Sequence, residues 1–357
     1  MKHIATLLAT LATALLIEGC TAARILTFNI PTTHDSELFP RATLPASDTP
    51  FEPLRRDYYG ACPAIDTLFE DLCTMGIIAV RGDSIIYCHF RGGFDADKNS
   101  DLFSLSKSFV GALAGIALAQ GHITSESDFV AKYLPQSAKF LSDSTRVCDL
   151  LNMRGGIYES RWHTAQMYYT RNLGRTTLRS IQRHPHREYN YANISTQLLA
   201  NLIEQATGQN LIDYFVENYW LPSAAASEGY WSLDSHQHLG VRAFCGLSIT
   251  PIEVVKLGMI YRDGGTLGGR QIVPAEWVSH TINPPYTSND RGGATYHCQW
   301  YIINPDTEFL GQGFMGQILY VNRTTDTVVA RFGVRRGDTD WTRVMQQIAA
   351  LPNQFFW

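Results

Sequence analysis

The chain has no long run of like charges, no internal repeat and no low-complexity tract. It is therefore unlike a solenoid or a disordered polyelectrolyte. Its 29 basic and 33 acidic residues give a formal net charge of -4, which offers no strongly basic surface for nucleic acid or an anionic membrane. Because only 17% of the 357 residues are charged and 45% are hydrophobic, a substantial core can be buried.

The sequence also has little that is spaced for metal binding or cross-linking. The histidine pairs His184/His186 and His236/His238 lack a well-spaced third ligand, and there is no Cys-x-x-Cys. We therefore expect no metal and no cofactor. With Cys20 set aside, an even number of cysteines remains, which permits disulfides in an exported protein. In a chain of this length we interpret most of them as small buried apolar residues: Cys62, Cys73, Cys88, Cys148, Cys245 and Cys298.

Residues 1–23 are expected to form an export signal. Met1-Lys2-His3 precedes an apolar stretch, residues 4–17, that is too short for a comfortable membrane span. Gly19-Cys20 resembles the junction of a bacterial lipoprotein, in which Cys20 would carry a lipid anchor to the membrane, whereas Thr21-Ala22-Ala23 offers an ordinary cleavage site. Both interpretations predict an exported protein in the bacterial periplasm or outer cell envelope.

Residues 24–60 are rich in proline and have little periodicity, which predicts a tether before a folded domain at 61–357. Apolar runs predict strands within this domain, the first two joined by a hairpin: residues 76–80, 84–90, 296–303, 317–322 and 327–334. Helices are predicted between and after these strands, one of them with Thr250 as its N-cap: residues 102–120, 196–206, 251–261 and 339–351. The order predicts an α/β (α+β) fold whose sheet uses both chain ends, with a helical lobe at about 120–240.

Ser104-Leu105-Ser106-Lys107 is the only S-x-x-K in the chain, and it opens the most apolar predicted helix. Residues three apart on a helix share a face, so Ser104 and Lys107 can touch. Burial and the positive end of the helix dipole both favour a neutral lysine, which could accept the serine proton. The alternative is structural, with Ser104 capping the helix and Lys107 on the surface.

Two further segments could contribute to a site. Tyr191-Ala192-Asn193 precedes the helix predicted at 196–206, and its tyrosine and asparagine could point into one cleft. Tyr320-Val321-Asn322 has the same Tyr-x-Asn pattern, but it lies in a predicted strand of alternating hydrophobicity, where a structural role is favoured. The glycine-rich residues 311–317 lead into a predicted strand, and a backbone N–H at Gln317 could face an oxyanion. The alternatives are a packing tyrosine and an ordinary hairpin.

Taken together, these segments resemble the serine beta-lactamase and penicillin-binding-protein superfamily, and within it the class C type branch that includes esterases and aminohexanoate-oligomer hydrolases. The nucleophile segment Phe103–Phe109 and Tyr191-Ala192-Asn193 match its motifs. Three further stretches match other landmarks of that family: Leu150–Gly156 (LLNMRGG), Gly246–Pro251 (GLSITP) and Ile272–Trp277 (IVPAEW).

The resemblance implies a mainly antiparallel sheet flanked by terminal helices, with an inserted all-helical lobe. It also implies that Ser104 attacks the substrate, that Lys107 and Tyr191 move protons, and that Asn193 orients the substrate or Lys107. The backbone N–H groups of Ser104 and Gln317 would form the oxyanion hole.

One motif departs from the family pattern. The family usually has Lys or His, a small residue and Gly, but this chain has Phe314-Met315-Gly316. We therefore expect a bulky, apolar pocket wall without the cation that would meet a beta-lactam carboxylate. The prediction is a serine hydrolase that cleaves a small-molecule or peptide amide or ester through an acyl-enzyme on Ser104. The alternatives are a binding or sensor protein without turnover, and a beta-lactamase proper.

Overall fold

The computed structural model describes residues 21–28, 31–33, 35–55, 65–66, 73–183 and 186–352. The expected export signal up to Cys20, and also Cys62 and His184, lie outside the described residues. Within the described part of the chain, no helix is both long enough and apolar enough to span a membrane.

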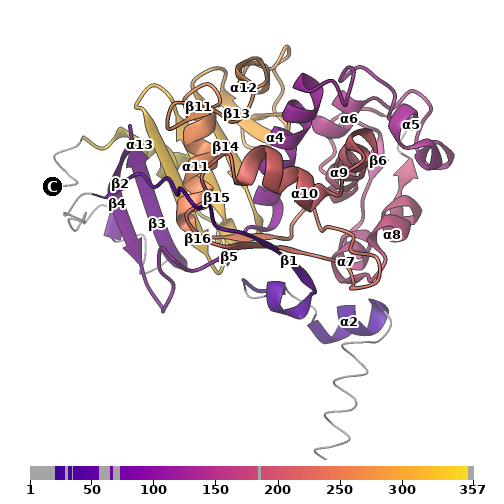
Figure 1. Ribbon diagram of the computed structural model, residues 1–357, viewed down its shortest axis with the longest axis horizontal. Helices are drawn as coiled ribbons and strands as arrows, with labels where there is room; N and C mark the ends of the chain where they lie inside the picture. Colours follow the sequence, from indigo (N-terminus) through magenta and orange to yellow (C-terminus); the bar gives the residue numbers. More distant parts are fainter. Residues whose placement is uncertain are drawn as a thin grey trace, which may run out of the picture.

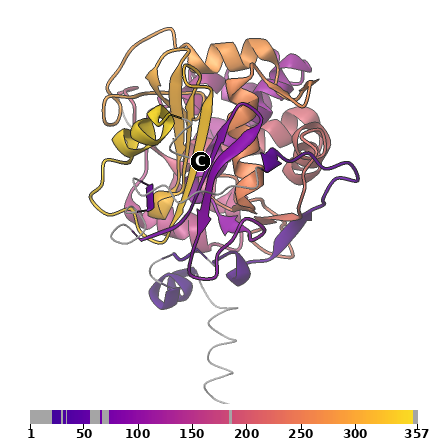
Figure 2. The same cartoon turned by 90° about the vertical axis from the view of Figure 1, so that its left-hand side faces the viewer.

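An eight-stranded sheet forms one side of the described structure (Figures 1 and 2). Its strand order is β12-β13-β14-β15-β16-β3-β4-β2, and every neighbouring pair is antiparallel except β2 with β4. The last strand, β16 (Thr327–Gly333), pairs with the early strand β3 (Thr74–Arg81), which confirms a sheet built from both chain ends. The other strands are β2 (Leu54–Arg55), β4 (Ser84–Phe90), β12 (Thr295–His297), β13 (Trp300–Asn304), β14 (Glu308–Gln312) and β15 (Ile318–Asn322).

Helices cover both faces of this sheet. Along β16, side chains alternate between the faces, so that Val328 joins the core cluster under α11 (Pro251–Arg262) and Val329 joins that under α13 (Trp341–Ala350). Gly258 lets α11 approach closely, since a Cβ there would lie 2.4 Å from Val328 Cγ1. Thr250 precedes α11 as predicted, but its side chain makes no capping hydrogen bond.

A mainly helical lobe is inserted between residues 120 and 240, beside α4 (Ser106–Ala119) (Figure 1). Its helices are α5 (Val130–Tyr133), α6 (Val147–Leu151), α7 (Arg161–Tyr169), α8 (Leu173–Ser180), α9 (Asn193–Thr207) and α10 (Leu211–Phe215). The lobe is not all helical, because β6 (Ile157–Tyr158) pairs with β7 (Gln182–Arg183) and the lobe also contains β8 (Gly229–Ser232). The prediction of an all-helical lobe is corrected accordingly.

The proline-rich segment before the domain is partly folded onto it. Residues Arg41–Leu44 form β1, which pairs with β8 in a second sheet of order β1-β8-β9-β5 that includes β9 (Leu247–Ile249) and β5 (Ser100–Asp101). Leu44 is buried, and the Trp220 indole donates to Pro45 O at 2.7 Å. This part of the segment therefore belongs to the domain rather than to a tether, because its backbone completes a sheet edge.

The strand predicted at 296–303 is two strands joined by a tight turn. Cys298 and Gln299 both adopt positive φ, 45° and 69°, between β12 and β13. The Gln299 side chain fixes the turn, because Nε2 donates to Leu151 O at 2.8 Å and Oε1 accepts from Thr196 Oγ1 at 2.7 Å. Turns of this kind usually contain glycine or asparagine, so nothing in the sequence indicated one here.

Candidate active site

Ser104 lies just before the long and almost completely buried helix α4. It belongs to the short 3-10 helix η2 (Phe103–Leu105), which leads directly into α4. Its neighbours Phe103 and Leu105 are buried while Ser104 remains partly exposed. Phe103 has a φ of 48°, an unfavourable conformation for a bulky residue. The backbone thus turns sharply to present the serine at the first turn of a helix.

Lys107 contacts Ser104 directly, as the S-x-x-K spacing predicted. Its Nζ donates to Ser104 Oγ at 2.8 Å, to Asn193 Oδ1 at 2.7 Å and to the backbone oxygen of Phe244 at 2.7 Å. The side chain is only 1% exposed, so the structural alternative of a surface lysine does not hold. Ser104 and Lys107 come from adjacent helical turns, and Asn193 comes from the start of α9.

Burial changes the proton affinity of both proposed proton carriers. It lowers the pKa of Lys107 from 10.5 to about 8, against smaller opposing effects from Cys245, Glu159 and Tyr301. It raises the pKa of Tyr191 above its usual value, while a hydrogen bond with Ser104 acts in the opposite direction. Lys107 Nζ also lies 5.1 Å from the centre of the Tyr191 ring. Ser104, Lys107 and Tyr191 therefore form one connected group.

Glu159 extends this group, and sequence reasoning missed it. One carboxylate oxygen accepts from Asn193 Nδ2 at 2.8 Å, and the other accepts from the backbone N–H of Ile194 at 2.9 Å. Glu159 thus orients the amide whose oxygen faces Lys107, and it caps the first turn of α9. No motif marks it, because it lies in the loop after β6 and reaches α9 only in the folded chain.

The segment that follows β14 forms another wall of the site around Ser104 and Tyr191. Phe314–Gly316 makes the short helix η5, in which Met315 has a φ of 61°. Phe314 is 53% exposed and packs edge-on against the Phe103 ring, at 5.6 Å between centroids. The Gln317 N–H makes only a long contact, 3.4 Å, with Phe314 O, and the Gln317 side chain is buried and donates to Gly333 O at 2.6 Å.

A cavity of about 600 Å³ opens in front of Ser104 and Tyr191. Its remaining lining comes from β14, η5 and the loops around them: Arg291, Gln312, Gly313, Phe314, Met315, Val334, Arg335, Arg336 and Gly337. Phe314 and Met315 form the expected apolar wall. The Phe314-Met315-Gly316 segment supplies no cation, but three arginines reach the cavity from loops distant in sequence from the S-x-x-K.

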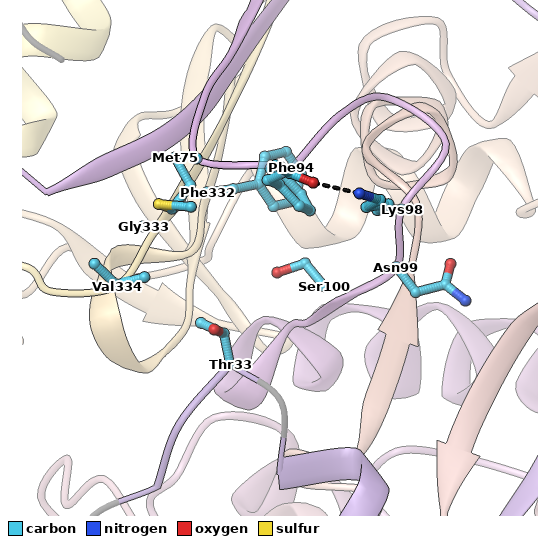
Figure 3. A pocket seen from close by; sticks show the side chains of 11 residues that line it. Thr33, Met75, Phe94, Lys98, Asn99, Ser100, Phe332, Gly333 and Val334 are labelled. Carbon is cyan, nitrogen blue, oxygen red and sulfur yellow. Dashed lines mark hydrogen bonds between the residues drawn. The ribbon is translucent and has the colours of Figure 1, made fainter.

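A smaller cavity of about 130 Å³ lies on another side of β16, beside Phe332 and Phe94 (Figure 3). Its lining is mostly apolar, and the amine of Lys98 is hydrogen-bonded to Gly93 O there. Ser104, Lys107 and Tyr191 do not line it. The larger cavity is therefore the one that Ser104 faces.

Other candidate residues have structural partners. Ser106 Oγ accepts from the Leu247 N–H at 3.2 Å, and Ser108 Oγ donates to Gln299 O at 3.0 Å. Tyr320 lies buried in β15, where its hydroxyl donates to the Glu308 carboxylate. His236 and His238 lie in an exposed loop. No disulfide links the described cysteines Cys73, Cys88, Cys148, Cys245 and Cys298.

An antiparallel sheet, a helical lobe and a serine–lysine–tyrosine group between them are features of a serine hydrolase that acts on amide or ester bonds. Comparison with known proteins supports this class. Residues 65–347 match the Beta-lactamase family model, and the chain therefore belongs to that family.

Three known proteins match most of the chain. It is 26% identical over 327 residues to the 6-aminohexanoate-dimer hydrolase of Paenarthrobacter ureafaciens, covering 83% of this chain and 82% of that one. Its fold matches a solved structure described as "Putative 6-aminohexanoate-dimer hydrolase from Bacillus anthracis" with a TM-score of 0.78 at 18% identity, covering 89% and 92% of the two chains. A family VIII carboxylesterase matches with a TM-score of 0.66 at 16% identity, covering 81% and 95%.

Proposed function

We propose that Ser104 is the nucleophile of this hydrolase. Its Oγ attacks the carbonyl carbon of an amide or ester, and its proton passes to neutral Lys107. Tyr191, bonded to Ser104, takes part in this transfer and returns a proton to the departing amine or alcohol. Water then hydrolyses the acyl-enzyme. The backbone N–H groups of Ser104 and Gln317 would hold the oxyanion, each contributing about 3 to 4 kcal/mol to the transition state.

We further propose that the preferred substrate carries a carboxylate. The observation that supports this is the set of three arginines at the cavity. Among the described residues, no carboxylate forms an ion pair with Arg291, Arg335 or Arg336. Burial and then the charge of the nearby Arg291 lower the pKa of Arg336, against smaller opposing effects from Tyr301 and Asp340, so the two guanidinium groups lie close enough to repel each other. Arginine binds carboxylate in a two-pronged geometry, and an anionic substrate would relieve this repulsion.

The comparisons agree with such a substrate. The Paenarthrobacter relative is named for the hydrolysis of 6-aminohexanoate dimer, a small linear amide that ends in a carboxylate. Cephalosporins are also anionic, but Phe314 and Met315 line the cavity beside Ser104 with bulky apolar side chains. We therefore propose a preference for slender linear substrates over bicyclic lactams.

The test compares the linear 6-aminohexanoate dimer with its methyl ester, which lacks the carboxylate. We expect wild-type kcat/KM to be higher for the free acid, and Arg336→Ala to lower it at least 10-fold while changing the methyl ester little. Arg343→Ala, an exposed arginine on α13, is the matched control and should behave like wild type.

Equal losses for both substrates in Arg336→Ala would contradict the carboxylate proposal. A cephalosporin kcat/KM in the range of efficient enzymes, roughly 10⁴ to 10⁸ M⁻¹s⁻¹, would instead indicate a beta-lactamase. A stoichiometric burst on an activated ester without steady turnover would indicate the binding or sensor function.

A further inference from the structure

A second cluster of reactive side chains lies behind the nucleophile helix. His280, near the end of α12 (Ala275–Ile282), meets His297 and Cys298 at the β12–β13 turn. One ligand atom from each lies within 4.8 Å of the other two. None of these residues lines the cavity of Ser104. Imidazole nitrogen and thiolate sulfur are the donors that Zn²⁺ prefers.

The separation between the His297 nitrogen and the Cys298 sulfur is close to that on a tetrahedral ion. Typical Zn–N and Zn–S bond lengths place a nitrogen and a sulfur on one tetrahedral ion about 3.6 Å apart. The observed separation of His297 Nε2 and Cys298 Sγ is 3.8 Å.

Both imidazoles are oriented by partners of the kind found around bound metals. His297 Nδ1 lies 3.0 Å from the backbone oxygen of Thr281, which fixes this nitrogen as the donor and leaves the lone pair of Nε2 facing Cys298 Sγ, with which Nε2 is in hydrogen-bond contact in the absence of an ion. Glu126, in the loop after α4, places Oε2 3.1 Å from His280 Nε2. A backbone carbonyl and a carboxylate are the usual groups that orient histidine ligands.

The backbone at the thiol is strained, and this is an independent observation. Cys298 is fully buried and lies with Gln299 in the left-handed region, which is costly for residues with a side chain. Gly111 of α4 makes room for the turn, since a Cβ there would lie 2.7 Å from Cys298 O. The strained turn directs the thiol toward the two imidazoles, so the fold maintains this juxtaposition at an energetic cost.

We propose that His280, His297 and Cys298 supply three protein ligands to a Zn²⁺ ion whose fourth tetrahedral position is taken by water, with Glu126 as the positioning residue for His280. The ion would join the loop after α4, the end of α12 and the β12–β13 hairpin. Glu126 and His280 also line a surface hollow of about 300 Å³, which gives an ion a route to the cluster. Because the cluster is outside the Ser104 cavity, the ion would stabilise the fold without taking part in turnover.

The experiment uses the full chain without a polyhistidine tag, first stripped of metal with a chelator. After exposure to Zn²⁺ and desalting, we expect about one ion per chain in wild type, and a loss of that ion in His280→Ala and in Cys298→Ser. Glu126→Gln should weaken binding about 10- to 100-fold, the usual effect of removing an orienting partner. Zn²⁺ should raise the Tm of wild type but not of His280→Ala.

Co²⁺ tests the sulfur ligand directly, because a thiolate bound to Co²⁺ gives a charge-transfer absorption band. We expect this band in wild type and in the control Cys88→Ser, whose cysteine is in β4, but not in Cys298→Ser. If wild type retains no more zinc than His280→Ala, or shows no thiolate band with Co²⁺, the proposal is wrong. If Cys298→Ser does not fold, the zinc content of His280→Ala and the Co²⁺ spectrum of wild type still test the proposal. Ester hydrolysis by metal-free protein reports on Ser104 separately.

Discussion

At the scale of single residues, the assignment of the nucleophile can be tested by labelling. Ser104 Oγ contacts Lys107 Nζ, whereas Ser106 accepts a hydrogen bond from Leu247 N–H instead. We expect a fluorophosphonate probe to label wild type on Ser104, as mapped by peptide mass spectrometry. Ser104→Ala should abolish labelling and turnover, while Ser106→Ala should keep substantial labelling. An adduct on another serine would refute the assignment.

The lowered pKa of Lys107 predicts a pH dependence. A lysine can act as a base only when neutral, and its pKa of about 8 leaves it mostly protonated at neutral pH. The value of kcat/KM should therefore rise as the pH increases through about 8 and then level off. Lys107→Ala and Tyr191→Phe should fold normally and lose about 10²-fold or more in rate. A profile that is flat between pH 6 and 9 would argue against this role.

Glu159 should act through Lys107 as a positioning residue. Its negative charge raises the Lys107 pKa, against the larger lowering by burial. Glu159→Gln should therefore shift the acid limb of the kcat/KM profile to lower pH, and also reduce kcat because the Asn193 contact is disturbed. Glu217→Gln, at an exposed site, is the control. An unchanged acid limb would mean that Glu159 only supports the fold.

At the scale of elements, the end of β14 lies close to the segment that carries Ser104, and a glycine without a side chain permits this close approach. A Cβ on Gly313 would lie 2.1 Å from Leu102 O, a backbone atom that cannot move without moving η2. Gly313→Ala should therefore lower the free energy of unfolding by about 1 to 3 kcal/mol, the usual cost of overpacking, and displace Ser104 enough to reduce kcat. Urea unfolding and ester hydrolysis would measure both effects.

The matched control is Gly174→Ala in α8, where a new Cβ would meet nothing within 4 Å. Alanine favours helix over glycine by up to about 1 kcal/mol, so this change should leave stability unchanged or raise it. If both alanine variants retained wild-type stability and activity, the close approach of β14 to η2 would be important neither for folding nor for the position of Ser104.

At the scale of the whole molecule, we propose that the protein is exported and anchored through Cys20. In the native host the mature chain should lack Met1, and a fatty-acid probe should label wild type but not Cys20→Ala. Cleavage near Arg24 without labelling would indicate simple secretion to the periplasm. Intact Met1 on the mature protein would contradict export by this signal.

The sequence by itself determined the parts of this protein that depend on local geometry. Helical spacing alone places Lys107 beside Ser104, and the apolar runs locate β3, β4, β15 and β16 to within a few residues. The order of these elements, with the family motifs, also indicated the sheet from both chain ends. Such features follow from the fixed periods of helix and strand.

Only the tertiary structure decided the features that join distant segments. Glu159 meets Asn193, three arginines meet the Ser104 cavity, β1 completes a sheet edge on β8, and His280 meets Cys298. The local sequence around each of these residues resembles an ordinary loop or strand end. Their proximity depends on how the two lobes pack, and packing is set by the summed burial of many side chains rather than by any short spacing.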